Sequence, residues 1–158
     1  MKKGFSLPVW VAAAAKSAVR NLLGLPFESY EKIKIPNKDL NLNVKVHSVA
    51  CLKKQSESLA ITFVDSGLDL DLTQNLEIWA LTSWEGNGEK AYIDKQLNIT
   101  AGHGVGINEK TSKICISSFA KLILEENLNQ FIPNNKRLNL EIIFPAGVFL
   151  AERTSNKS

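Results

Sequence analysis

The pattern of apolar and polar residues changes period once along the chain. Residues 12–23 hold alanine, valine and leucine with few polar interruptions, which is typical of a helix. Ser6 and Pro8 suit the start of this helix, and Gly24 suits its end, because glycine readily adopts the left-handed conformation that closes a helix. After Gly24 the pattern becomes the two-residue alternation of β-strands.

Six to eight short strands are predicted after this helix, separated by polar turns. Residues 37–39 and 53–56 have the composition of hairpin turns. A second helix is predicted over residues 119–131, capped by Ser117 or Ser118 and stopped by Pro133. The predicted strands are residues 30–36, 42–52, 57–64, 76–84, 97–100, 113–116, 138–145 and 148–151.

Two helices and strands joined mostly by hairpins predict an α+β fold. We expect a two-layer sandwich with a mostly antiparallel mixed sheet and two main helices, rather than a repeated βαβ winding. The length of 158 residues and the mass of 17.5 kDa fit a single domain over residues 1–158 with a sizeable core.

Composition and charge narrow the classes of partner. The net charge of +3 is small and the basic residues are scattered, which argues against nucleic acid and leaves room for an anionic small-molecule substrate. No apolar run reaches the ~18 residues that would span a membrane. Cys51 and Cys115 have apolar surroundings, and we expect two buried free thiols in a reducing, cytoplasmic location. With two histidines in the chain, no spacing matches a zinc site.

The N-terminus offers an alternative location. Its charged start, apolar middle and small residues copy a signal peptide superficially, although Lys16 interrupts the run.

The segment least explained by folding alone is the acidic bend, residues 65–73. It follows a predicted strand and holds Asp65, Gly67, Asp69, Asp71 and Thr73. Polar turns at strand ends are where a scaffold commonly presents a site.

The residues of the acidic bend by themselves leave several interpretations open. Asp69, Asp71 and Thr73 match the Asp-x-Asp-x-Thr start of haloacid dehalogenase-type phosphatases. That chemistry needs later acidic residues for Mg²⁺, and the chain has no Asp after Asp94. Calcium would need a different spacing and a closing Glu. The remaining alternative is a solvated turn in which Asp side chains cap backbone N–H groups.

A second candidate segment is the glycine turn, residues 101–106. It contains Gly102, His103, Gly104 and Gly106. One interpretation is simply a tight turn. The other is a set of backbone N–H groups that approach an anionic ligand closely, with His103 able to titrate or donate a hydrogen bond.

Taken together, these segments resemble the CbiD family in order and spacing. The family opens with Gly-[Phe/Tyr]-Thr-Thr-Gly-Thr-Cys and an alanine-rich helix with Lys, which Gly4, Phe5 and Lys16 match. Its acidic segment lies over residues 64–78, and its Gly-x-Gly-Val-Gly lies over residues 102–106. Its Ala-x-x-Thr-x-Asn lies near the C-terminus. The matching positions in the acidic and C-terminal segments are Asp65, Gly67, Asp69, Asp71, Thr73, Glu77, Ile78, Ala151, Thr154 and Asn156.

The chain also departs from the family pattern. Residues 7–10 replace the polar Thr-Gly-Thr-Cys, and Leu68 and Leu70 replace Asp and Pro. Asn75 replaces Gly, and residues 116–121 replace Ile-Asn-Pro-Val-Pro-Arg. These changes mark a divergent branch.

The resemblance implies S-adenosylmethionine-dependent methyl transfer to C-1 of cobalt-precorrin-5B in anaerobic cobalamin synthesis. Cobalt would then arrive only within the substrate, with no metal site in the chain. Family members are about twice as long, so the resemblance implies the N-terminal domain of a two-domain enzyme. The alternative is a non-catalytic tetrapyrrole- or cofactor-binding module that lacks its partner domain. Oligomeric state and the domain that holds S-adenosylmethionine are left open.

We further expect the acidic bend and the glycine turn to converge on one cleft, and we assign roles to the candidate residues on that hypothesis. Asp65 and His103 are the candidate general bases. Lys16 and Arg153 are candidates to meet substrate carboxylates. The remaining expected binding residues are Gly67, Asp69, Asp71, Thr73, Gly102, Gly104, Gly106, Thr154 and Asn156.

Overall fold

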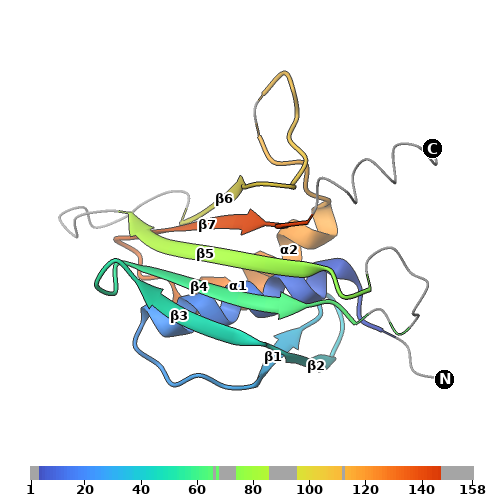
Figure 1. Cartoon of the computed structure of the whole chain (residues 1–158), viewed down its shortest axis with the longest axis horizontal. Helices are drawn as coiled ribbons and strands as arrows, with labels where there is room; N and C mark the ends of the chain where they lie inside the picture. The colour runs from blue at the N-terminus through green and yellow to red at the C-terminus, as the bar shows by residue number, and fades with distance from the viewer. Residues whose placement is uncertain (1–3, 66, 68–73, 86–95, 112, 147–158) are drawn as a thin grey trace.

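The computed structural model describes residues 4–65, 67, 74–85, 96–111 and 113–146. In these residues, two α-helices and seven strands follow one another (Figure 1). The elements are α1 (Leu7–Leu22), β1 (Tyr30–Lys34), β2 (Asn41–Lys45), β3 (Ser48–Leu52), β4 (Glu57–Phe63), β5 (Glu77–Glu85), β6 (Leu97–Ala101), α2 (Ser118–Leu128), a short 3₁₀ turn (Asn129–Phe131) and β7 (Arg137–Ile143).

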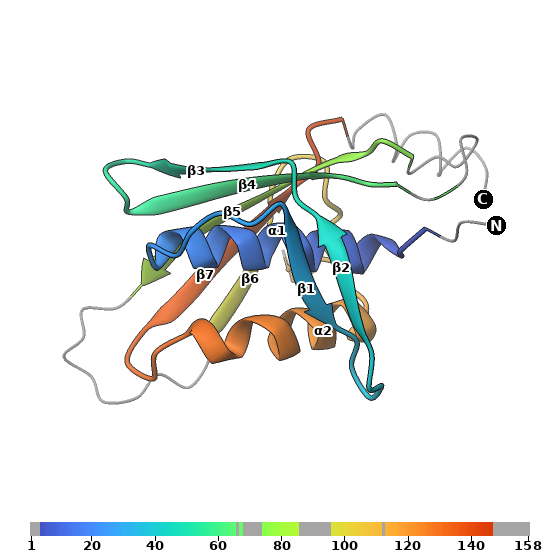
Figure 2. The ribbon, with the colours of Figure 1, turned by 90° about the horizontal axis from the view of Figure 1, so that it is seen from below.

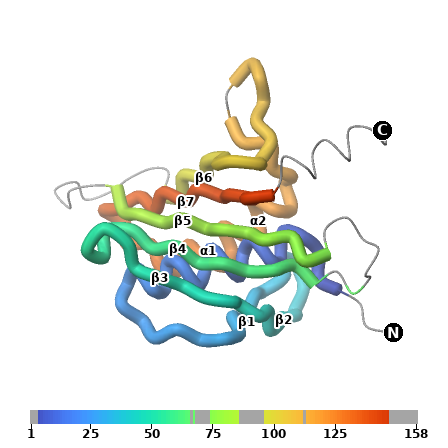
Figure 3. The backbone as a smooth tube through the Cα atoms, viewed as in Figure 1, coloured from blue at the N-terminus to red at the C-terminus, as the bar shows by residue number. Residues whose placement is uncertain are grey.

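Five strands form one sheet in the order β3-β4-β5-β7-β6. All neighbours are antiparallel except β6 and β7, which run parallel and are connected through α2 (Figure 3). β1 and β2 form a separate antiparallel pair. The α+β class and the mostly antiparallel mixed sheet are therefore confirmed.

The predicted strand over residues 42–52 is two strands in two different sheets. The N–H of Val46 donates to the carbonyl of Ser29 at 2.8 Å, on the β1 side. The next N–H, of His47, donates to the carbonyl of Ile61 in β4 at 2.9 Å. The chain therefore changes sheets between consecutive residues, without a turn signal in the sequence.

Two further expectations from the sequence are corrected. The predicted strand over residues 113–116 is only an isolated bridge between Ile107 and Ile114. The thiols of Cys51 and Cys115 are free but exposed rather than buried. Cys51 lies on β3, which is an edge strand of the sheet, and Cys115 lies on the segment between β6 and α2. Apolar neighbours in the sequence therefore did not predict the burial of either thiol. The predicted strand over residues 148–151 lies outside the described residues.

Helix α1 is buried on nearly every side. The five-stranded sheet covers one side, while α2 and the β1–β2 hairpin flank it on the others (Figure 2). Its alanines are completely buried, and such small side chains let the helix approach its neighbours closely. The buried residues of α1 are Val9, Trp10, Val11, Ala12, Ala13, Ala14, Ala15, Ser17, Ala18 and Val19.

Both helices have ends that the sequence predicts. Gly24 has a φ of 80°, its N–H donates to the carbonyl of Asn21, and the N–H of Leu25 donates to that of Arg20, which is a Schellman ending. At the start of α2 the hydroxyl of Ser117 accepts the N–H of Ala120 at 3.1 Å. Glycine and serine at these positions therefore define where the helices stop and start.

A buried amide connects α2 to β1. The Asn127 side chain accepts the N–H of Lys34 at 2.8 Å and donates to the carbonyl of Lys34 at 2.9 Å. It also donates to the carbonyl of Ile123 within its own helix. The amide thus pairs with β1 as a neighbouring strand would.

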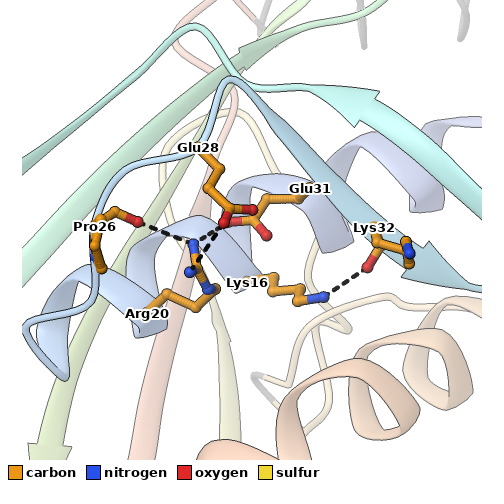
Figure 4. Close-up of polar contacts among 6 residues, drawn as sticks. All are labelled: Lys16, Arg20, Pro26, Glu28, Glu31 and Lys32. Atoms are coloured by element: carbon orange, nitrogen blue, oxygen red, sulfur yellow. Dashed lines mark hydrogen bonds and ion pairs between the residues drawn. The ribbon is translucent and has the colours of Figure 1, made fainter.

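A buried ion pair connects α1 to β1 (Figure 4). The guanidinium of Arg20 lies 3.1 Å from the carboxylate of Glu31, whose side chain is only 2% exposed. Burial raises the pKa of Glu31, although Arg20 acts to lower it. Arg20 therefore provides most of the favourable interaction that offsets the cost of burying this carboxylate.

Replacing Arg20 by Ala should lower the free energy of unfolding by about 3 kcal/mol at neutral pH, because it leaves a buried carboxylate unpaired. The loss should shrink as the pH falls through the folded-state pKa of Glu31, which burial raises above the ordinary 4.5, and it should be smallest below 4.5, where Glu31 is protonated in both folded and unfolded states. Denaturant unfolding at several pH values measures this. A second change, Glu31→Gln, should restore part of the loss.

Glu126→Gln provides the matched control. It removes the exposed pair with Lys34, in which the two side chains are 60% and 35% exposed, and should change the free energy of unfolding by less than about 1 kcal/mol. An equal loss in Arg20→Ala and Glu126→Gln would contradict the role assigned to the buried pair.

Replacing Asn127 by Ala should cost about 2 kcal/mol of unfolding free energy, since the N–H and carbonyl of Lys34 lose their partners. Asn129→Ala is the control. Because that residue is exposed, its replacement should change the free energy of unfolding by no more than about 0.5 kcal/mol. Thermal and denaturant unfolding of both variants test this, and equal stabilities would rule out the amide connection.

Candidate functional site

A pocket of about 490 Å³ lies at the start of the acidic bend, and we call it the acidic-bend pocket. The segment before α1, the first turn of α1, the β1–β2 hairpin and the end of β4 surround it. Its lining residues are Gly4, Phe5, Trp10, Tyr30, Asn43, Lys45, His47, Phe63, Val64, Asp65, Gly67, Gln74 and Asn75.

Aromatic side chains form much of the wall of this pocket. Tyr30 is 57% exposed and Phe63 is 39% exposed, although large apolar surface normally avoids water. The ring of His47 packs edge-on against Phe63, with centroids 5.0 Å apart. The indole N–H of Trp10 donates to the carbonyl of Phe5, and the two rings are 5.8 Å apart. The pocket therefore offers flat, partly uncovered surfaces that suit a planar ring.

The same pocket carries charges of both signs. Lys45 and His47 approach from the β2 side, and Asp65 approaches from the end of β4. One oxygen of Asp65 accepts the N–H of Gly67 at 3.0 Å, and Gly67 has a φ of 81°. This local turn fixes the direction of the carboxylate, as a capping Asp does. Nδ1 of His47 lies 3.0 Å from the hydroxyl of Ser48, which orients the imidazole.

The structure shows the glycine turn as a tight turn that closes onto β7. The N–H of Gly102 donates to the carbonyl of Ile142 at 2.8 Å, so it already has a protein partner. The N–H of Val105 donates back to Gly102, and Gly104 has a φ of 81°. His103 is exposed, and its carbonyl accepts the N–H of Phe144.

Asp65, where the acidic bend begins, and the glycine turn lie at the same edge of the five-stranded sheet. The end of β4 pairs with the start of β5, and β6 and β7 end next to one another close to that start. Gly106 faces a second, mostly apolar pocket of about 230 Å³. The start of α1 contributes to both pockets: Trp10, together with the preceding Phe5, lines the first, and Leu7, Pro8 and Val11 line the second. The two segments thus flank the beginning of one helix.

Lys16 lies away from the acidic-bend pocket, in the polar cluster between α1 and β1. Its ammonium donates to the carbonyl of Lys32 at 2.7 Å (Figure 4). Burial lowers the pKa of Lys16, while the nearby carboxylate of Glu31 acts to raise it. Six other residues expected in the site lie outside the described residues, namely Asp69, Asp71, Thr73, Arg153, Thr154 and Asn156.

The β2 side of the pocket was not anticipated from the sequence. Asn43, Lys45 and His47 occur at every second position, so they share one side of the extended chain while Val44 and Val46 face the core. That alternation was the available signal. Only the folded chain shows that this polar side and Asp65 line one pocket.

Among the described residues, no group of three or more His, Cys, Asp or Glu side chains is arranged to hold a metal ion. Within the same part of the chain, neither helix has the length and apolar character needed to cross a bilayer.

An α+β fold with a pocket of mixed charge and aromatic surface at the sheet edge has the features that are typical of small-molecule sites. The family follows from comparison with known proteins: the chain belongs to the CbiD family, whose model matches residues 1–158. This confirms the resemblance seen in the sequence.

Curated relatives support the assignment. The chain is 59% identical over 160 residues to a protein of Prochlorococcus marinus subsp. pastoris (strain CCMP1986 / NIES-2087 / MED4), covering 100% of this chain and 43% of that relative. It is 42% identical over 158 residues to a protein of Synechococcus sp. (strain CC9902), covering 99% and 41%. Both relatives are named cobalt-precorrin-5B C(1)-methyltransferase. The chain spans less than half the length of these relatives.

A solved structure supports the fold. The cobalamin biosynthesis protein (cbiD) from Archaeoglobus fulgidus aligns with a TM-score of 0.64 and 20% identity, over 99% of this chain and 48% of that chain. At this identity the likeness concerns the fold alone.

Two glycines of the glycine turn should respond differently to substitution. A Cβ on Gly102 would lie 2.5 Å from Cγ1 of Ile143 and 3.0 Å from the carbonyl of Ile142. Gly102→Ala should therefore lower the free energy of unfolding by about 1–3 kcal/mol. A Cβ on Gly106 would lie 3.8 Å from that of Cys115, an ordinary contact, and Gly106→Ala should change the free energy of unfolding by less than about 1 kcal/mol. Parallel denaturant unfolding tests this, and equal tolerance of both changes would contradict it.

Proposed function

We propose that this chain is the N-terminal domain of an S-adenosylmethionine-dependent methyltransferase that acts on C-1 of cobalt-precorrin-5B. The observation that carries the proposal is the 59% identity, over the whole chain, to a relative with that name. Family membership over residues 1–158 supports it.

In this reaction the main task of the protein is to align the two reacting groups. S-adenosylmethionine, when bound, supplies an already activated methyl group. The protein then has to hold a carbon nucleophile in line with that methyl and to exclude competing geometries. Cobalt belongs to the substrate in this proposal, and no residue of the chain is assigned to it.

The donor set of the acidic-bend pocket fits S-adenosylmethionine in kind. Asp65 offers a carboxylate, Lys45 offers an ammonium, and Tyr30 and Phe63 offer aromatic surface. A ligand with a carboxylate, positive charge and an adenine ring needs these three kinds of partner. The residues present are therefore compatible with the cofactor that the reaction requires.

The length difference from the relatives shapes the proposal. The chain covers 43% of the Prochlorococcus relative, so most of that enzyme has no counterpart in these 158 residues. We assign to this domain one wall of the active site, at the sheet edge where Asp65 and the glycine turn lie. The remaining wall and part of the substrate contact belong to the rest of such an enzyme.

A chimera tests the proposed function. This chain replaces the matching segment of the Prochlorococcus relative, and the purified chimera is given cobalt-precorrin-5B and S-adenosylmethionine. We expect a product that has gained the mass of one methyl group, at a rate within about tenfold of the parent enzyme, or ~1.4 kcal/mol in the barrier. The parent enzyme is the positive control.

A folded chimera without methylated product would contradict the proposal. Thermal unfolding of the chimera and the parent separates loss of folding from loss of chemistry. A chimera that binds tetrapyrrole or cofactor but transfers no methyl group would favour a non-catalytic binding module instead.

A further inference from the structure

The helices cover only one face of the five-stranded sheet. α1 contacts β3, β4 and β5, and Figure 2 shows both helices and the β1–β2 hairpin on one side of these strands. Figure 1 looks onto the opposite side, which we call the outer face. No described helix or strand lies over the outer face, so its side chains have no packing layer within this part of the chain.

An apolar patch crosses the outer face. Ser58, Ala60 and Thr62 of β4 are buried toward α1, so the residues between them point outward. The buried Ala80 and Thr82 show the same alternation on β5. The outward positions at the centre of the sheet are apolar. The outer-face patch consists of Leu59, Ile61, Trp79, Leu81 and Ile143.

The strand register makes this patch continuous. Leu59 lies opposite Leu81, and Ile61 lies opposite Trp79. Trp79 also lies opposite Ile143 on its other side. Cross-strand neighbours on one face are close enough to contact one another. All five residues are half-buried, and none belongs to the hydrophobic core of the described residues or to the side chains packed against it. The patch therefore takes no part in the packing of this domain.

Polar side chains surround the patch on the same face. An apolar centre with a polar rim is the usual composition of a protein interface, and large apolar patches that are rimmed in this way mark interaction sites. The polar residues of the rim are Glu57, Glu77, Ser83, Asn139 and Glu141.

We propose that the outer-face patch is the surface on which the rest of the longer enzyme docks, through an apolar layer of the polypeptide that follows this chain in its relatives. This inference rests on the proposed function, which makes the chain an N-terminal domain, and adds to it the surface that joins the two parts. The chain covers 43% of the Prochlorococcus relative and 41% of the Synechococcus relative. More than half of each relative therefore has to pack beside this domain.

The position of β7 favours this occupant over a second copy of the chain. β7 is the last described strand, and its neighbour β5 carries Trp79 and Leu81. Ile143, the last residue of β7, belongs to the patch. The polypeptide that continues from β7 therefore leaves the sheet beside the patch. Because it is covalently attached, its effective concentration there is high, whereas a second copy has no such connection.

The patch also extends to the candidate site. Phe63, two residues after Ile61 on β4, is on the same face, is 39% exposed and lines the acidic-bend pocket. A layer docked on the patch therefore reaches the edge of the sheet where this pocket lies. There it is placed to supply the remaining wall of the active site.

Cysteine labelling tests the docking surface without any need for turnover. Leu81→Cys is made in this chain alone and in the chimera, and a maleimide reagent is added to each. Peptide mass spectrometry follows position 81 separately from the exposed Cys51 and Cys115. Labelling should be slower in the chimera by about tenfold or more, because a thiol buried in an interface reacts only when the interface opens. Thermal unfolding confirms that both proteins are folded.

Gln130→Cys is the matched control for labelling. This position is exposed and lies in the short 3₁₀ turn after α2, outside the sheet. It should react at the same rate in the chain alone and in the chimera.

A charge placed in the patch provides a second measurement. Leu81→Lys should lower the thermal unfolding midpoint of the chimera by several degrees, because the ammonium would be buried against an apolar layer without a partner. The same change in the chain alone should alter the midpoint little, since the charge stays in water there. Gln130→Lys should leave both midpoints unchanged.

Several results would overturn the inference. One is labelling of position 81 at equal rates in the chain alone and in the chimera. Another is protection of position 130 as strong as that of position 81. A third is slow labelling in the chain alone together with a concentration-dependent dimer in analytical ultracentrifugation, since a second copy would then cover the face.

The labelling result and the methylation result are independent of one another. If the chimera transfers the methyl group while position 81 labels freely, the docking surface alone is wrong. If position 81 is protected and the folded chimera transfers no methyl group, the docking surface is supported and the proposed reaction is wrong.

Discussion

The close packing of α1 between the sheet and the remaining elements is the constraint on which the other features depend. Ala12 to Ala15 and Ala18 are completely buried, and their small side chains allow the helix backbone to lie near β4 and β5. The start of this helix contributes to both pockets, and Arg20 near its end pairs with Glu31. A larger side chain in the alanine run would displace the helix and alter both pockets at once.

The change of sheet after β2 has a functional consequence. Val46 bonds toward β1 and His47 bonds toward β4, so the polar side of the hairpin is held against the end of β4. This connection brings Lys45 and Asp65, twenty positions apart, to one pocket. The buried amide of Asn127 supports the same hairpin from α2. The candidate site is thus assembled by contacts between elements rather than by any single motif.

The two candidate segments of the sequence have different roles in the structure. The start of the acidic bend combines a local turn with a pocket of mixed charge, so Asp65 has both a structural partner and a place on a site. The glycine turn closes onto β7, and the close approach of Gly102 to Ile142 and Ile143 explains a glycine there without a ligand. For Gly102, sterics decide the residue type. For Asp65, the hydrogen bond within the turn explains part of the preference for an aspartate, and its position on the pocket is a second explanation.

Both helices, most strands, the α+β class and the family could be predicted from the sequence, because these depend on local periodicity, on capping residues such as Ser117 and Gly24, and on ordered motifs. The second helix was predicted to end at residue 131, whereas α2 ends at Leu128 and a short 3₁₀ turn follows. The sequence did not show that residues 42–52 divide between two sheets, that Cys51 is exposed, or that Lys45 and His47 line the same pocket as Asp65. Alternation shows which residues share one side of a strand, but what lies opposite that side depends on elements distant in the chain. The pocket could not be predicted, because its walls come from separate segments of the chain whose contacts leave no local pattern in the sequence.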